Sequence, residues 1–233
     1  MKTGIVKSGI VLVAMFALLW AEPARAAVIY SNSTNDNMIR FNPGLLEVGD
    51  EINLVGSERY LTNFSFEYYG TNTASAFTFA GSPEARIRFY LNDGAPFNGY
   101  PTPGSNFYDS GWFSVPSPTE RSTFVFEVGL DFSSPGLYMP VISNFTWSVQ
   151  FTNYGGTDEL GVDIYDPPTV GSGYKDYWEF SAGVWTLKTN INPAIKMNFA
   201  SRFEATVPEP SALALSVLGG LGLLAVARRL RGR

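Results

Sequence analysis

The 233-residue chain contains no cysteine and no histidine. Without cysteine it forms no disulfide bonds, so core packing must hold the fold together. Without histidine, Ser-His-Asp and Cys-His catalysis, imidazole-bound zinc or copper, and an imidazole pH switch are excluded. Metal binding by oxygen ligands and chemistry by pairs of carboxylates remain open.

Positive charge is scarce between the two ends of the chain. Residues 27–207 hold nine lysines and arginines against nineteen aspartates and glutamates, a net charge of −10, whereas the whole chain carries −5. An acidic body of this kind argues against binding nucleic acid or anionic lipid through a basic patch. We therefore expect no nucleic-acid partner.

The first apolar run is short. The sequence IVLVAMFALLW follows two lysines and precedes Ala24, Arg25 and Ala26. A positive start, a short apolar core and a small-residue cleavage site are typical of a secretory signal peptide. We predict a signal helix in residues 1–26 and cleavage by signal peptidase, which leaves Ala27 at the N-terminus. An uncleaved membrane anchor is the alternative.

The last apolar run is also short, but its flanks differ. Residues 207–233 read VPEPSALALSVLGGLGLLAVARRLRGR. The apolar residues 212–227 make a helix of about 24 Å, shorter than the roughly 30 Å hydrocarbon core of a bilayer. We predict a C-terminal transmembrane helix that stops transfer but matches the bilayer poorly. Its basic end, which the positive-inside rule places in the cytoplasm, consists of Arg228, Arg229, Arg231 and Arg233.

This C-terminal segment resembles the PEP-CTERM sorting signal of Gram-negative bacteria. Its opening box consists of Val207, Pro208, Glu209, Pro210 and Ser211, and the apolar helix and the arginine cluster follow in order. The resemblance implies cleavage near the box by an exosortase, a membrane enzyme, and only transient anchoring in the inner membrane. It also implies a final location at the cell surface or outside the cell, where such proteins are associated with exopolysaccharide and biofilm. A plain single-pass anchor is the alternative.

Between the two ends, apolar and polar residues alternate with a period of two. The clearest case is NFTWSVQFTN, and the pattern returns in EARIRFYLND, RSTFVFEVGL and AIKMNFASRFEA. Alternation indicates strands with one buried and one wet face, as in antiparallel sheets. For residues 27–206 we predict an all-β fold, an antiparallel β-sandwich that is jelly-roll-like and has ten to twelve strands. A seven-stranded immunoglobulin-type sandwich is the alternative.

The segment RYLTNFSFEYYG predicts a strand whose buried face carries Tyr60, Thr62, Phe64, Phe66 and Tyr68. Stretches such as TNFSFEYYG, RIRFYLNDGAP, FTWSVQFTN and LGVDIYDPPTVGSGYKDYWE resemble a recurrent domain of exported proteins. The resemblance implies a compartment and a fold class for the body, but no activity.

One region concentrates residues that suit a carbohydrate. Residues 163–185 include five tyrosines and tryptophans, Tyr165, Tyr174, Tyr177, Trp178 and Trp185. Aromatic rings stack on sugar faces, and neighbouring carboxylates bind hydroxyl groups. The sequence therefore suggests a glycan-binding loop, with plugging of the sandwich core as the alternative.

The same region offers hard oxygen ligands for calcium in Asp163, Asp166 and Asp176. No EF-hand loop is present, and ordinary solvated acidic loops are the alternative. We expect no obligatory cofactor.

Catalysis would need two carboxylates across a cleft, as in glycoside hydrolases. Glu67, Glu127 and Glu179 qualify by residue type, but Glu67 and Glu127 lie on predicted polar strand faces and no spacing singles out a pair. The first expectation is an exported, non-enzymatic surface or matrix protein. The second is a carbohydrate-binding module that uses residues 163–185, and the third is a glycan hydrolase.

Overall fold

The computed structural model describes residues 26–132, 142–189 and 196–207, which all belong to one compact unit. This part is all-β, with antiparallel pairing throughout. The predicted signal helix, apart from Ala26, lies outside the described residues. The predicted sorting signal lies outside them too, apart from Val207. Both terminal helices therefore stay predictions.

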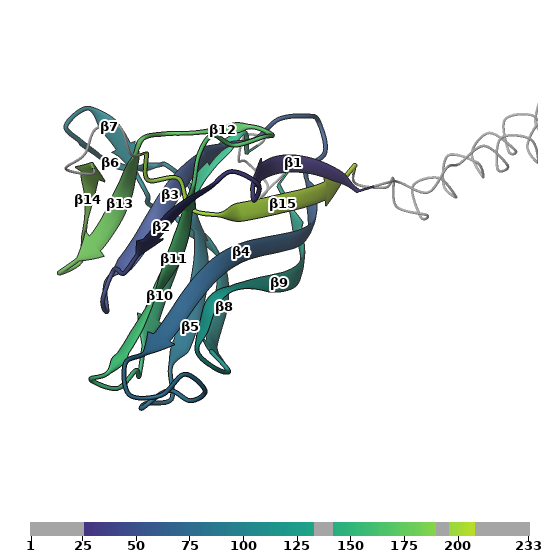
Figure 1. The fold of residues 1–233 in the computed structure, drawn as a ribbon. Helices are drawn as coiled ribbons and strands as arrows, with labels where there is room; N and C mark the ends of the chain where they lie inside the picture. The colour runs from purple at the N-terminus through teal and green to yellow at the C-terminus, as the bar shows by residue number, and fades with distance from the viewer. Residues whose placement is uncertain (1–25, 133–141, 190–195, 208–233) are drawn as a thin grey trace, which may run out of the picture. The chain divides into compact units, whose positions relative to one another are not determined.

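Two sheets make up the body (Figure 1). In the first sheet the order is β1 (Ala27–Asn32), β15 (Ser201–Thr206), β4 (Tyr60–Asn72), β11 (Asp158–Tyr165) and β2 (Asp36–Phe41), and β9 (Thr119–Asp131) also pairs with β4. In the second sheet the order is β14 (Val184–Thr189), β13 (Asp176–Ser181), β3 (Glu47–Asn53), β10 (Asn144–Thr152), β5 (Glu84–Tyr90) and β8 (Asn106–Ser114). The short β12 (Ser172–Gly173) pairs with β3, and β6 (Gly94–Phe97) and β7 (Tyr100–Thr102) form a separate hairpin.

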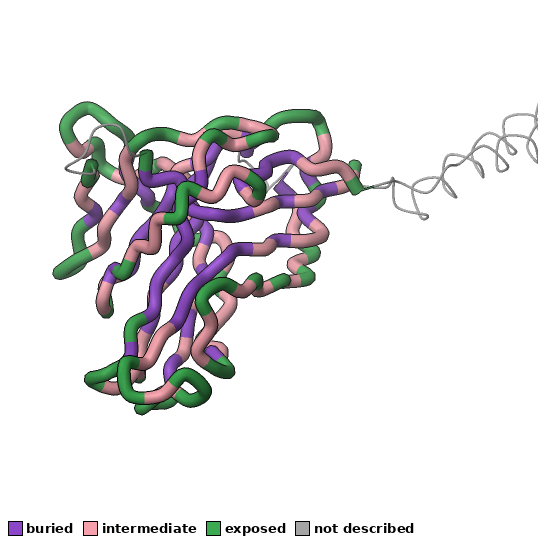
Figure 2. The backbone as a smooth tube through the Cα atoms, in the orientation of Figure 1, coloured by how far each residue is buried: buried purple, intermediate pink, exposed green. Residues whose placement is uncertain are grey.

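The alternating residues of the sequence build the core between these sheets. Phe145, Trp147, Val149 and Phe151 of β10 are all fully buried, as the period-two pattern predicts. Aromatic rings meet across the two layers: the ring centroids of Phe64 and Trp147 lie 5.3 Å apart. Figure 2 shows the buried central strands that result. The arrangement is that of an antiparallel β-sandwich.

The first residues of β4 do not follow the predicted alternation. The register of β4 shifts between Leu61 and Asn63 against both β9 and β15. Leu61 is therefore buried on the core side with Phe64, while Tyr60 is 38% exposed and Thr62 is only half-buried. The prediction that Tyr60 and Thr62 share the buried face is wrong, because an extra residue in a strand reverses the facing of those before it.

One carboxylate lies inside the sandwich. Asp50 of β3 is fully buried, and its Oδ2 accepts a hydrogen bond from the backbone N–H of Phe199 at 2.9 Å. Phe199 itself forms a bridge with Ile164 of β11, in the first sheet. Burial raises the pKa of Asp50 well above its usual value. The Asp50 carboxyl thus links the two sheets and is stabilised in its protonated form.

Candidate functional site

The structure separates the five aromatic residues that the sequence groups into one glycan-binding loop. Tyr165 ends β11 and is fully buried. Tyr177 packs against interior rings, and Trp178 and Trp185 lie on the other face of the second sheet at 1% and 9% exposure. Tyr174 alone is openly exposed, at 44%. Buried rings cannot stack on a sugar, so these residues do not form one glycan-binding surface.

The three aspartates proposed as calcium ligands are also separated. Asp163 is fully buried, with its Oδ1 3.0 Å from Nε of Arg40. Asp166 lies 3.2 Å from Nζ of Lys196, and Asp176 begins β13. Across the described ranges, no group of three or more acidic side chains is placed to hold a metal ion. The predicted calcium site is therefore not formed here, because two of its carboxylates face cationic side chains instead.

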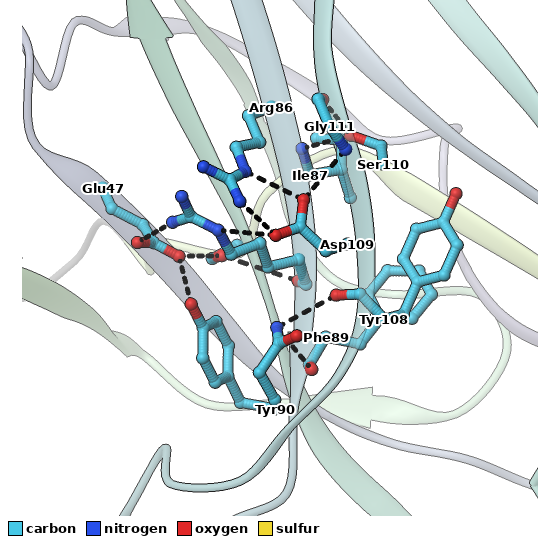
Figure 3. A network of polar contacts seen from close by, with 12 residues as sticks. Glu47, Arg86, Ile87, Phe89, Tyr90, Tyr108, Asp109, Ser110 and Gly111 are labelled. Atoms are coloured by element: carbon cyan, nitrogen blue, oxygen red, sulfur yellow. Dashed lines mark hydrogen bonds and ion pairs between the residues drawn. The ribbon is translucent and has the colours of Figure 1, made fainter.

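The outer face of the second sheet carries a connected set of charged side chains (Figure 3). At its centre Glu47 of β3 is only 3% exposed. Its carboxylate accepts hydrogen bonds from Ser148 Oγ at 2.6 Å, from the Tyr90 hydroxyl at 3.0 Å and from Arg88. Arg88 Nε lies 3.4 Å from Oδ2 of Asp109 on β8. The network thus joins four neighbouring strands: β3, β10, β5 and β8.

Asp109 also holds Arg86. Its carboxylate accepts two hydrogen bonds from that guanidinium, one of them from Nε at 2.8 Å, and a third from the backbone N–H of Gly111 at 2.9 Å. The hydrogen bond from Arg86 lowers the pKa of Asp109 to about 2, so the carboxylate is ionised at neutral pH. The guanidinium carbon of Arg86 lies 5.7 Å from the ring centroid of Trp112, which is 40% exposed.

A β-bulge in β8 places Asp109 and Trp112 on the same face. In a regular strand, residues three apart point to opposite faces. Here Trp112 pairs with Arg86 and Asp109 pairs with Arg88, so β8 holds one extra residue between the two pairs. Gly111 adopts a φ of +66° at this point, a conformation that glycine reaches without strain. The sequence signal was Asp-Ser-Gly inside the strand-like run NFYDSGWFSV.

The other half of this face is closed by aromatic rings. Trp185 of β14 lies 5.3 Å from Tyr90 of β5, although three strands separate β14 from β5 in the sheet order. The second sheet is therefore strongly curved, so that its outer face is concave between β14 and β5. Phe97 of the β6–β7 hairpin packs edge-on against Trp178, with centroids 6.5 Å apart. These contacts explain why Trp178 and Trp185 are buried although neither faces the core between the sheets.

The outer face of the first sheet carries a second polar network. Glu67 of β4 is 6% exposed and accepts hydrogen bonds from Arg121 Nε at 2.5 Å and from the Tyr165 hydroxyl at 2.6 Å. Arg121 also lies over the Tyr165 ring, 5.2 Å from its centroid. On β2, Asp36 binds Arg40, which in turn faces the buried Asp163. Glu67 is thus buried and paired with Arg121, and it is not the solvated carboxylate that a polar strand face would carry.

The carboxylates suggested for a hydrolase do not form a glycosidase-like pair. Glu127 pairs with Asn63 in the register of β9 and β4, four residues from Glu67. At ~3.4 Å per residue the separation along the strand is roughly 14 Å, more than the 5–10 Å that glycosidase carboxylates need. Glu179 belongs to the second sheet, where it lies 3.6 Å from Lys188.

A hollow of about 350 Å³ lies at one end of the sandwich, lined by residues 77–79, 81–83 and 114–116. Phe77 at its rim is 85% exposed. Its lining contains no charged side chain. The hollow therefore lacks the acid and base groups of a catalytic site.

Comparisons with protein-family models, with curated proteins and with solved structures find no match to this chain. Within the part of the chain that the structure describes, no helix has the length and hydropathy of a membrane span. Of the surfaces described above, the open part of the second sheet's outer face combines an exposed aromatic ring with fixed polar groups. It is the candidate functional site.

Proposed function

We propose that this chain is an exported, non-enzymatic protein of the cell surface or extracellular matrix. In this proposal signal peptidase removes residues 1–26, an exosortase processes the C-terminal signal, and the product is associated with exopolysaccharide. The observation that carries the proposal is the extent of the folded body. Its first strand begins at Ala27 and its last ends at Thr206, next to the two predicted processing sites.

The pairing of the terminal strands supports this reading. β1 pairs with β15, and Ala27 lies opposite Ala205 (Figure 1). Both ends of the body are therefore fixed side by side in one sheet. The flanking Ala26 and Val207 are exposed, and Val207 is 53% exposed. A cut just before Ala27 or after Val207 removes no strand from the sandwich, so the body keeps its paired elements after processing at both ends.

The connectivity supports the finer, jelly-roll-like assignment within the β-sandwich class. From β8 to β11 the chain crosses between the layers at each step: β8 lies in the second sheet, β9 in the first, β10 in the second and β11 in the first. Such alternation between two sheets is a feature of jelly rolls. An experimentally determined structure in which β8, β9, β10 and β11 lie in one sheet would contradict it.

The test is the intact mass of the protein recovered from the native host's surface and medium. We expect an N-terminus at Ala27 and a C-terminus near Pro208, with or without an added group. Replacing Pro208, Glu209 and Pro210 by alanine should leave the tail in place. A product that ends at Arg233 in the membrane fraction would mean a plain anchor and would overturn the sorting proposal.

A further inference from the structure

We propose that the open part of the second sheet's outer face, formed by Arg86, Asp109 and Trp112, binds a neutral polysaccharide chain. This assignment goes beyond the export proposed above and does not depend on it. It places the ligand on β5 and β8, whereas the sequence pattern pointed to residues 163–185. Three features of this face point to such a ligand: one exposed tryptophan, the fixed polar groups beside it and the charge of the surface.

Trp112 is the open ring of this face. Three tryptophans lie on the described part of the face, and Trp178 and Trp185 are buried by Phe97 and Tyr90. Trp112 remains 40% exposed. An indole that is half in water offers a flat apolar surface, which matches the apolar face of a pyranose ring.

Arg86 and Asp109 supply fixed polar groups beside that ring. Two hydrogen bonds join them, and a third ties Asp109 to the backbone of the bulge at Gly111. Because these side chains are already ordered, little further rotamer freedom is lost when a ligand binds. A carboxylate that accepts and a guanidinium that donates can together bind neighbouring hydroxyl groups of a sugar.

The ion pair between Arg86 and Asp109 is also open enough for a ligand to reach it. The side chains of Arg86 and Asp109 are 28% and 31% exposed. Solvent, and therefore a sugar hydroxyl group, can reach both side chains, and Trp112 beside them is 40% exposed. The arrangement therefore leaves polar and aromatic surface free for a ligand.

The charge of the surface favours a neutral ligand. Arg86 is paired with Asp109, and Arg88 is paired with Glu47. No positive charge is left over in this set, and residues 27–207 carry a net charge of −10. An anionic polysaccharide would be repelled by such a body. A neutral chain binds by stacking and hydroxyl hydrogen bonds alone and meets no such penalty.

The test is affinity gel electrophoresis of the full chain in mild detergent, in gels that contain a neutral β-glucan, a neutral galactomannan or anionic alginate. We expect retardation by at least one neutral polysaccharide and none by alginate. Trp112→Ala should weaken the binding at least tenfold. Arg86→Lys keeps the positive charge but cannot form the bidentate hydrogen bonds to Asp109, so it should also weaken binding. Melting curves of both variants show whether the fold is retained.

Tyr174→Ala is the matched control, because Tyr174 is exposed to a similar degree but lies in the loop between β12 and β13, not on β5 or β8. It should leave the binding unchanged. Binding that survives Trp112→Ala, or that is lost in Tyr174→Ala instead, would overturn the site. Retardation by alginate alone, or by none of the three polysaccharides, would overturn the ligand class. None of these results bears on processing of the termini, so this proposal and the export proposal fail separately.

Discussion

Asp163 has a buried carboxylate with two cationic and two anionic neighbours. Arg40 faces it from β2, and Asp36, also on β2, and Glu67 on β4 add negative charge, while Arg121 on β9 adds positive charge. Burial raises the pKa of Asp163 to about 7, although Arg40 opposes the shift. The folded protein therefore binds a proton at this residue more tightly than the unfolded chain does.

The free energy of unfolding should depend on pH through the titration of Asp163. Because the folded-state pKa is raised, the protonated Asp163 contributes stability below about pH 4, and this contribution is lost as the pH rises to about 7. The Asp163→Asn protein should not show this loss of stability between pH 4 and pH 7. The expected difference in the free energy of unfolding is roughly 2–4 kcal/mol, at ~1.4 kcal/mol per pKa unit. Urea unfolding of both proteins at pH 4.5 and 7.5 measures it. Equal pH dependence in the two proteins would show that Asp163 titrates normally in the folded state.

At the scale of the elements, β11 packs against its neighbours too closely for a side chain at one position. Gly161 faces Tyr69 of β4 in the register and lies beside Phe41 of β2. A Cβ added there would overlap the carbonyl oxygen of Phe41 and lie 2.6 Å from Cε1 of Tyr69. Two β-bulges also matter at this scale. One turns Leu61 toward the core, and the other places Trp112 on the same face as Asp109.

Gly161→Ala should therefore destabilise the protein by about 2–3 kcal/mol, since the clash is with backbone and with a packed ring. Gly156→Ala is the matched control. Gly156 has no atom within 4 Å of an added Cβ, so the change there should stay within about 0.5 kcal/mol. Chemical unfolding of the three proteins gives both values. A Gly161→Ala protein as stable as the parent would mean that β2 and β4 move apart without cost.

For the whole molecule, the absence of disulfides is compensated by packing across and along the sheets. The core is rich in phenylalanine, and rings such as Phe64, Phe89 and Phe203 contact one another between the layers. Ion-pair networks join neighbouring strands on both outer faces, around Glu47 and around Glu67. The terminal strands pair with each other at one edge of the first sheet, so the described fold depends on both ends of the body.

Truncation tests this dependence. A chain of residues 27–207 should melt cooperatively, because every described strand is retained. A chain of residues 33–207 lacks β1 and therefore loses two buried core side chains, Ile29 and Tyr30. Because the lost core contacts are not replaced, this chain should not fold stably at 25 °C. Circular dichroism during thermal unfolding distinguishes the two. Cooperative melting of the shorter chain would show that β15 needs no partner in β1.

The sequence by itself determined the fold class and the buried faces of regular strands such as β10. Its period-two pattern reports burial directly, and antiparallel sheets follow from it. The sequence is also the basis for the predicted destination of the protein, because export and sorting signals are read as linear segments. Only the tertiary structure decided the sites. Tyr165 and Trp178 are close in sequence but lie in different sheets, whereas Arg86 and Trp112 meet through a bulge and a strand pairing. Such neighbours depend on register and sheet order, which local patterns do not encode.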